Sequence, residues 1–131
     1  MDMLIDFPEG ARVEAHFDSL TLRTDQPPED GGQGSAPTPF DTFLASLATC
    51  AGYYVLDFCR KRGIDTQKIR LRQQAQQDVT TGLVRTVRLE IQLPPDFPEK
   101  YRAAVVRAAE LCKVKRHLEH PPTFEIETSI G

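Results

Sequence analysis

Residues 38–62 constrain the fold more than any other segment, because both ends carry the signals that start and stop an α-helix. Thr38 stands at the N-cap position, Pro39 follows at the first helical position, and Asp41 comes three residues after the cap, as in a capping box. At the far end three consecutive basic residues suit the negative end of the helix dipole, and Gly63 permits a left-handed stop. This punctuation predicts one helix over residues 38–62, about 37 Å long.

The remaining segments alternate between strand-like and helical patterns. Residues 11–17 and 20–24 alternate apolar and polar side chains and predict a hairpin, and the Pro- and Gly-rich residues 25–36 predict a loop. We further expect strands over 68–80 and 83–93, a helix over 101–112 continued by a short one over 113–119, and a last strand over 120–130. The order ββ-α-ββ-α-β, without a repeat or a long internal linker, predicts one α+β two-layer domain spanning residues 1–131.

The overall charge and composition narrow the choice of partners and location. The chain has 16 basic and 19 acidic residues, a net charge of −3, which argues against nucleic acid as a partner. It contains no uninterrupted run of 18 apolar residues, so we expect no transmembrane helix and no membrane partner. The first ten residues lack the basic region and apolar stretch of a signal peptide. We therefore expect a cytoplasmic protein.

Three cysteines, at positions 50, 59 and 112, are the candidate reactive groups. Their number is odd, and their spacing matches neither a disulfide framework nor a CxxC metal pair, so we expect no metal site. A permanent disulfide is not expected in a reducing compartment. Two interpretations remain open from this pattern: buried apolar thiols, or a redox-active thiol with or without a partner.

Helical geometry separates the first two cysteines. An apolar stripe on the predicted helix consists of Phe40, Phe43, Leu44, Leu47, Ala51, Tyr54, Val55 and Phe58. Cys50 lies at the edge of this stripe, in the mixed surroundings that a reactive thiol needs. Cys59 points about 180° away from Cys50, which excludes a disulfide between them on one straight helix. We interpret Cys59 as a packing residue.

Cys112 lies at the junction between the two predicted C-terminal helices. If the short helix begins at Lys113, free backbone N–H groups and the basic side chains of Lys113, Lys115 and Arg116 favour a thiolate at Cys112. His117 could add to this potential, although a lone histidine is more often a surface or capping residue. The alternative is that Cys112 is simply a small residue at a helix junction.

Two motifs carry a family resemblance. "GGQGSAPTPFDTFLASLATC" resembles the Gly-rich segment, helix and first cysteine of OsmC/Ohr-type proteins, and "AAELCKVKRHLE" resembles their second motif, a helix that ends in a cysteine. Together with the element order, the similarity covers nearly the whole chain. It implies an OsmC-like α+β fold, as an intertwined homodimer with two long central helices and one site at each subunit boundary.

The resemblance also implies a chemistry. The characterised branches of the family reduce hydroperoxides, organic ones especially, and need no cofactor. By this resemblance Cys50 is the attacking thiol, Cys112 is the resolving thiol that forms a disulfide with it, and an external thiol reductant resets the pair. Phe43 and Tyr54 would line a pocket for the organic part of the substrate, and the role would be defence against oxidative stress.

The sequence departs from the family pattern at the groups that would assist Cys50. Peroxidase branches carry a Glu ten residues before the first cysteine, paired with an Arg from the preceding loop. Here that position is Phe40, with Asp41 one step later, and no Arg lies between Thr24 and Cys50. Asp41 and Arg23 are therefore the possible accessory residues. A further departure is Lys113, which stands where the family often has proline.

These departures keep a second hypothesis open. A non-catalytic OsmC-like protein could use the same dimer-interface pocket to bind a small apolar or thiol-bearing ligand. A purely structural domain is a third possibility, but it leaves both thiol motifs unexplained.

Overall fold

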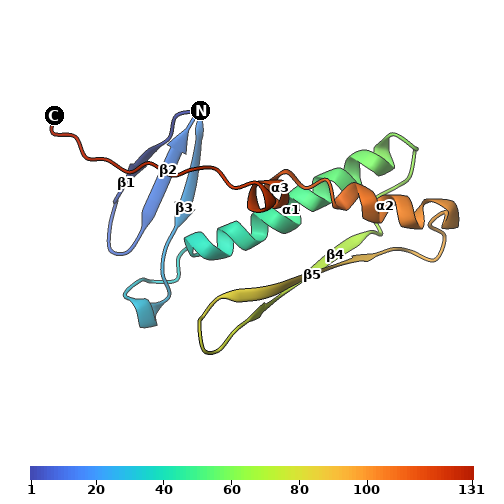
Figure 1. The fold of residues 1–131 in the computed structure, drawn as a ribbon, viewed down its shortest axis with the longest axis horizontal. Helices are drawn as coiled ribbons and strands as arrows, with labels where there is room; N and C mark the ends of the chain where they lie inside the picture. The colour runs from blue at the N-terminus through green and yellow to red at the C-terminus, as the bar shows by residue number, and fades with distance from the viewer. The chain divides into compact units, whose positions relative to one another are not determined.

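The computed structural model describes residues 1–131 and confirms the α+β class (Figure 1). It contains three α-helices, two 3₁₀-helices and five strands, in two antiparallel sheets. Contacts within the chain divide it into a first unit, Met1–Ala45, and a second unit, Ser46–Gly131. The two cysteine motifs fall together in the second unit, so this unit holds the candidate site.

The first unit contains a three-stranded antiparallel sheet in the order β1-β2-β3. Its strands are β1 (Leu4–Asp6), β2 (Val13–Phe17) and β3 (Leu20–Thr24). The predicted hairpin is β2–β3: Phe17 pairs with Leu20 across a two-residue turn in which Asp18 has φ 54°. Strand β1 was not predicted, because three residues are too few to show an alternating pattern.

The predicted loop after β3 is held by one buried carboxylate. Asp25, 1% exposed, accepts hydrogen bonds from the backbone N–H groups of Gln26, Gln33 and Ser35 and from the Ser35 hydroxyl. The Ser35 hydroxyl, the Ser35 N–H and the Gln26 N–H lower the pKa of Asp25 from 3.8 to about 2. Gly32 is required beside it, because an added Cβ would lie 1.9 Å from the carbonyl oxygen of Gln26. A short 3₁₀-helix, η1 (Pro28–Asp30), completes the loop.

The long helix α1 (Pro39–Arg60) has the predicted caps. At its start the N–H of Asp41 donates to Thr38 Oγ1 at 3.1 Å. At its end the N–H of Ile64 donates to the Cys59 carbonyl at 2.9 Å, that of Gly63 donates to the Arg60 carbonyl at 3.3 Å, and Gly63 has φ 66°. This is a Schellman motif, and it ends the helix where the glycine predicted.

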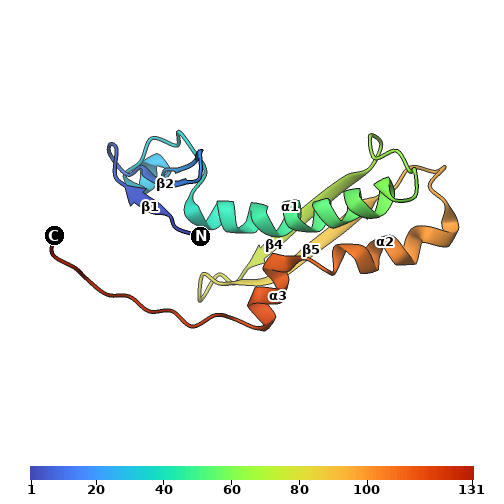
Figure 2. The same cartoon turned by 90° about the horizontal axis from the view of Figure 1, so that it is seen from above.

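In the second unit, helices cover one face of a hairpin. Strands β4 (Arg70–Gln77) and β5 (Val84–Gln92) pair antiparallel, with Gly82 at φ 75° in the turn. A short η2 (Glu99–Tyr101) leads into α2 (Arg102–Ala109), which is followed by α3 (Lys113–Glu119). Figures 1 and 2 show α1 and α2 on the same side of the hairpin. The buried core between these elements consists of Ala51, Val55, Phe58, Cys59, Ile69, Phe97, Val105, Ala109 and Cys112.

The predicted last strand over 120–130 is wrong. Residues 121–131 have no regular secondary structure, and Phe124, Ile126 and Ile130 are almost fully exposed. The alternating pattern describes which side chains would share a face, but a strand also needs a neighbouring strand with free backbone groups. Within the chain no strand pairs with this segment, so the observed order ends with two helices.

Helix α1 is also long and apolar enough, by length and composition only, to cross a membrane. The mean hydropathy of its most apolar window is 1.3, although no uninterrupted apolar run of that length exists. The core helix of a soluble protein meets the same criterion. Here Ala51, Val55 and Phe58 on α1 are buried in the core of the second unit, and 22% of the apolar window is buried.

Candidate active site

Cys112 links α2 and α3 and forms the N-cap of α3, as its position before Lys113 predicted. The backbone N–H of Lys115 donates to Cys112 Sγ at 3.4 Å, and Cys112 Sγ lies 3.7 Å from the Leu47 carbonyl oxygen of α1. The side chain is buried, with 3% exposure. Because its sulfur contacts the start of α3 and the middle of α1, Cys112 is held between the two helices.

Cys50 projects from α1 toward the same place. It packs against the buried cluster that contains Cys112, and the backbone N–H groups of Val114 and Lys113 and the Cys112 thiol are near enough to lower the pKa of its thiol. Cys50 remains half-buried, so solvent and small molecules have access to it. Two cysteines that are 62 positions apart in the sequence are therefore direct neighbours, both reduced, at the start of α3.

The pKa values of the two thiols are shifted in opposite directions. Burial raises the pKa of Cys50, but the N–H of Val114, the Cys112 thiol, and the N–H and charge of Lys113 outweigh it, so the pKa of Cys50 is lowered. Burial raises the pKa of Cys112; the N–H of Lys115 opposes this, whereas the neighbouring Cys50 raises the pKa further. When one thiolate forms, Cys50 is favoured to carry it while Cys112 keeps its proton.

Cys59 is fully buried on α1. Burial raises the pKa of its thiol, and the charge of Arg62 opposes this only in part. A buried thiol with a raised pKa is a poor nucleophile. The structure thus agrees with the interpretation of Cys59 as a packing residue.

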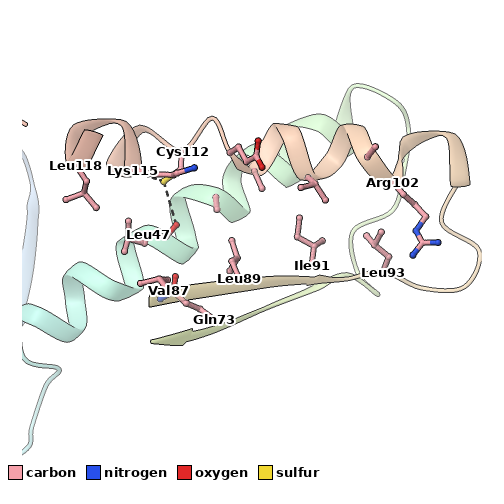
Figure 3. Close-up of a pocket in the computed structure, with 15 residues that line it drawn as sticks. Leu47, Gln73, Val87, Leu89, Ile91, Leu93, Arg102, Cys112, Lys115 and Leu118 are labelled. Carbon is pink, nitrogen blue, oxygen red and sulfur yellow. Dashed lines mark hydrogen bonds between the residues drawn. The ribbon is translucent and has the colours of Figure 1, made fainter. Parts of the chain in front are cut away.

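A cavity of about 650 Å³ is lined by Cys112, whereas Cys50 is not among its lining residues (Figure 3). Strand β5 contributes Val87, Leu89 and Ile91, with Leu93 beyond its end, and α1 and α2 contribute further apolar side chains. Figure 3 shows Cys112 and Lys115 at one end of the cavity and Arg102 at the other. The arrangement therefore combines a thiol pair with an adjoining apolar space large enough for an organic molecule.

Phe43 and Tyr54, which were predicted to form the substrate pocket, do not line this cavity. Phe43 is in the first unit and stacks on Phe40, with ring centroids 5.8 Å apart. Tyr54 packs against Tyr53, with ring centroids 5.6 Å apart. Neither Phe43 nor Tyr54 lines the cavity, which is formed by smaller apolar side chains instead.

The two possible accessory residues also belong to the first unit, whereas both thiols belong to the second. Arg23 is exposed and its Nε lies 3.3 Å from Glu14 Oε2, so its charge is already paired within the sheet. Asp41 lies in the first turn of α1, where its charge suits the helix dipole. The groups that lower the pKa of Cys50 are the backbone N–H groups of Val114 and Lys113, the Cys112 thiol and the charge of Lys113.

Two parts of the site were missed in the sequence. One is the pair of α3 N–H groups, from Lys113 and Val114, that lower the pKa of Cys50; the Val114 group also lowers the pKa of Cys112. The other is the contribution of β5 to the cavity. The alternating side chains Val87, Leu89 and Ile91 did signal one apolar strand face, but the pattern does not say whether that face meets a packed core or an open space.

Comparisons with known proteins agree with this fold. A Psychrobacter arcticus protein, named for osmotic stress induction and a detoxification response, has a similar structure: TM-score 0.73, 22% identity, 87% of this chain and 85% of that chain covered. An OsmC-like protein of Mycoplasma pneumoniae has a TM-score of 0.70 and 14% identity, with 92% of this chain and 87% of that chain covered. A Legionella pneumophila organic hydroperoxide resistance protein OsmC has a TM-score of 0.55 and 20% identity, with 90% of this chain and 89% of that chain covered. At these identities the likeness shows the fold alone.

No curated protein matches this sequence. The family model for OsmC-like protein, however, matches residues 32–127, which include Cys50 and Cys112. The chain therefore belongs to the OsmC-like family.

Proposed function

We propose that this protein is a thiol-dependent hydroperoxide reductase in defence against oxidative stress, acting on organic hydroperoxides. The observation that carries the proposal is the contact between Cys50 and Cys112, in which Cys50 has the lowered pKa and Cys112 the raised one. A thiolate beside a protonated thiol is what a two-cysteine peroxide reaction needs, because one sulfur must attack first and the other must wait.

The reaction begins at Cys50. Its thiolate attacks the distal oxygen of the peroxide, the O–O bond breaks, and the alkoxide leaves and takes a proton to become an alcohol. Cys50 is thereby oxidised to a sulfenic acid. The N–H groups of Lys113 and Val114, which donate to the thiolate, keep the sulfur in place beside Cys112.

The second step joins the two sulfurs. Cys112 attacks the sulfenic sulfur, an S–S bond forms, and the hydroxyl group leaves as water with the proton from Cys112. An external thiol reductant then supplies two electrons and two protons by disulfide exchange. This dependence on reduced thiols favours the cytoplasm as the location.

We also propose that the protein is a homodimer. The support is the large apolar surface that the single chain leaves exposed, on β1 and β3 (Leu4, Ile5, Leu20, Leu22) and on the last residues (Phe124, Ile126). A sheet normally buries at least one face against another layer. A second copy is the simplest source of that cover and agrees with the intertwined dimers that the family resemblance implies.

The alternative function is a binding protein without turnover. The observation that favours it is the set of groups around Cys50, which includes Lys113 but no arginine or carboxylate. Nothing there other than backbone N–H groups and one ammonium group would orient a peroxide. In that case the cavity beside Cys112 would hold an apolar or thiol-bearing ligand without reaction.

Thiol titration and intact mass spectrometry after treatment with cumene hydroperoxide separate the two functions. We expect the wild type to lose two of its three thiols and to form a Cys50–Cys112 disulfide. Cys112→Ser should accumulate a sulfenic acid at Cys50, and Cys50→Ser should leave Cys112 reduced. Cys59→Ala is the matched control, because it removes a thiol from the same helix and should still form the disulfide.

Two results would reject the reductase. One is that all three thiols remain reduced after treatment, which favours the binding protein. The other is equal oxidation of Cys50 and Cys112 without a disulfide, which contradicts the division of roles between the two thiols.

A further inference from the structure

The three-stranded sheet of the first unit has two chemically different faces. Residues directly opposite each other on neighbouring strands share a face, as do residues two apart on one strand. Ile5 pairs with Ala15, which pairs with Leu22, so one face is apolar. The other face carries two rows of paired residues, which are Asp6–Glu14–Arg23 and Leu4–His16–Thr21. This second face therefore gathers most of the polar side chains of the sheet.

Three metal-binding groups converge on the polar face. Nε2 of His16 lies 3.1 Å from Oδ2 of Asp6. One ligand atom from each of Asp6, Glu14 and His16 lies within 4.8 Å of the other two. Two ligands of a tetrahedral Zn²⁺ ion are about 3.3 Å apart, a spacing that the His16–Asp6 pair already has. Glu14 has the most flexible side chain of the three and can close the remaining distance by rotation.

The second ring nitrogen of His16 is also held. Its Nδ1 lies 3.1 Å from Oγ1 of Thr21. A histidine that binds a metal ion usually has its other ring nitrogen hydrogen-bonded, which fixes the ring and its tautomer. When Nδ1 donates to Thr21, Nε2 carries a lone pair and faces a carboxylate oxygen of Asp6, which also has only lone pairs. In this tautomer a cation between the two acceptors makes their close approach favourable.

The charge and exposure of the cluster suit a cation from solvent. Asp6 and Glu14 contribute two negative charges, and Arg23, whose Nε lies 3.3 Å from Glu14 Oε2, offsets one of them. One negative charge remains when His16 is neutral. The side chains of Asp6 and His16 are 62% and 38% exposed. An ion can therefore reach them and keep water at its remaining coordination position.

We propose that Asp6, Glu14 and His16 bind a divalent transition-metal ion of the Zn²⁺ type on the polar face of this sheet. An imidazole with two carboxylates suits Zn²⁺, whereas Mg²⁺ and Ca²⁺ prefer oxygen ligands alone. The expectation of no metal site rests on cysteine spacing, which concerns sulfur ligands only.

The role of the ion is structural. Its ligands come from β1 and β2, and β1 has only three residues, all exposed. An ion shared by both strands fastens β1 to the sheet. This site is independent of the proposed peroxide reaction, because its ligands belong to the first unit and the thiol pair belongs to the second.

Isothermal titration calorimetry with zinc chloride tests the site. The full-length Cys50→Ser/Cys112→Ser protein is the background for all variants, because thiolates also bind Zn²⁺. We expect it to bind one Zn²⁺ per chain, with no competition from excess Mg²⁺. Thr21→Val removes only the partner of Nδ1 and should weaken binding about tenfold. His16→Gln removes a ligand and should weaken binding more than Thr21→Val does.

Arg23→Gln separates a metal site from a network of ion pairs. It removes the positive charge beside Glu14 and should tighten Zn²⁺ binding several-fold, because that charge repels the ion. Glu9→Gln is the matched control. Glu9 is an exposed carboxylate in the same unit and also lies beside an arginine, with its Oε2 3.8 Å from Arg12 Nη2. Its replacement should leave the affinity for Zn²⁺ unchanged.

Three results would overturn the proposal. They are no Zn²⁺ binding by the background protein, equal affinity in His16→Gln, and an affinity that does not rise in Arg23→Gln. Urea unfolding tests the structural role separately, because Zn²⁺ should raise the midpoint of the background protein but not that of His16→Gln. Circular dichroism checks that each variant folds. Since the background lacks both reactive thiols, failure of the peroxide reaction leaves this test intact.

Discussion

At the scale of single residues, the position of backbone N–H groups decides which thiol reacts. Cys50 and Cys112 are chemically identical, and burial raises the pKa of both. The N–H groups of Val114 and Lys113 and the Cys112 thiol act on Cys50, whereas the N–H groups of Lys115 and Val114 act on Cys112, which also faces a developing negative charge at Cys50. The asymmetry therefore comes from the fold and not from the side chains themselves.

Replacing Lys113 with Gln should make Cys50 less acidic. The charge of Lys113 lowers the pKa of Cys50, so its loss raises that pKa and decreases the thiolate fraction at any pH below it. The rate of alkylation by iodoacetamide should rise with pH in both proteins, with the midpoint at higher pH in the variant. Lys115→Gln is the control and should leave the midpoint unchanged, because its side-chain charge is not among the groups that act on Cys50. A midpoint unaffected by Lys113→Gln would show that the ammonium group has no part in activating Cys50.

Asp25 should make the loop after β3 sensitive to acid. Its pKa is lowered from 3.8 to about 2 by hydrogen bonds that exist only in the folded state, so its contribution to stability is fully present above about pH 4. That contribution is lost as the pH falls toward 2. Asp25→Asn should lower the midpoint of urea unfolding at pH 7, and the gap from wild type should narrow at pH 2. A gap that stays constant between these pH values would contradict this account.

At the scale of secondary-structure elements, both ends of α1 and the start of α3 are set by short-range signals. Thr38 and Gly63 bound α1, and Cys112 caps α3 with its own side chain. The capping role of Cys112 is also what brings the first N–H groups of α3 to the thiol pair. The same local geometry thus serves both folding and the candidate chemistry.

Two glycine substitutions, one at the end of α1 and one inside it, test the conformation of this helix. Gly63 has φ 66°, so Gly63→Ala should destabilise the protein by about 1–2 kcal/mol, the cost of a left-handed residue with a side chain. Gly52 lies inside α1, and a Cβ there would meet only Leu71 Cδ2, at 3.8 Å. Gly52→Ala should therefore stabilise the protein by up to about 1 kcal/mol through helix propensity. Urea unfolding measures both; equal effects of the two changes would contradict the Schellman assignment.

At the scale of the whole molecule, the single chain leaves much apolar surface without cover. Strand β1 is exposed along its length, and Leu20 and Leu22 on β3 are 59% and 40% exposed. The last eleven residues carry Phe124 and Ile126 almost fully in solvent. Apolar surface on this scale is unusual for a monomer and marks an interaction surface.

We therefore predict a homodimer that does not dissociate at micromolar concentration. Each of these side chains that becomes buried on association should stabilise the dimer by about as much as the burial of an ordinary core side chain stabilises a fold. Sedimentation equilibrium of the reduced protein should give twice the 14.7 kDa mass of the chain. A folded monomer, with the circular dichroism of the native protein and no concentration dependence, would contradict the prediction.

Several features of this protein could be predicted from sequence alone because they depend on residues a few positions apart. The caps of α1, the hairpins β2–β3 and β4–β5, and Cys112 at the start of α3 were all predicted correctly. The prediction that Cys59 is a packing residue agrees with its full burial. In each case a cap, a turn or a helix face is decided by local backbone geometry.

Other features were decided only by the tertiary structure. The contact between Cys50 and Cys112, the order of their acid strengths and the cavity wall on β5 depend on segments far apart in the sequence. Residues 121–131 also depend on tertiary structure: their alternation predicted a strand, but no neighbouring strand pairs with them. Local patterns determine which conformations a segment can adopt. Packing between distant segments determines which groups meet, and the chemistry of a thiol depends on the groups it meets.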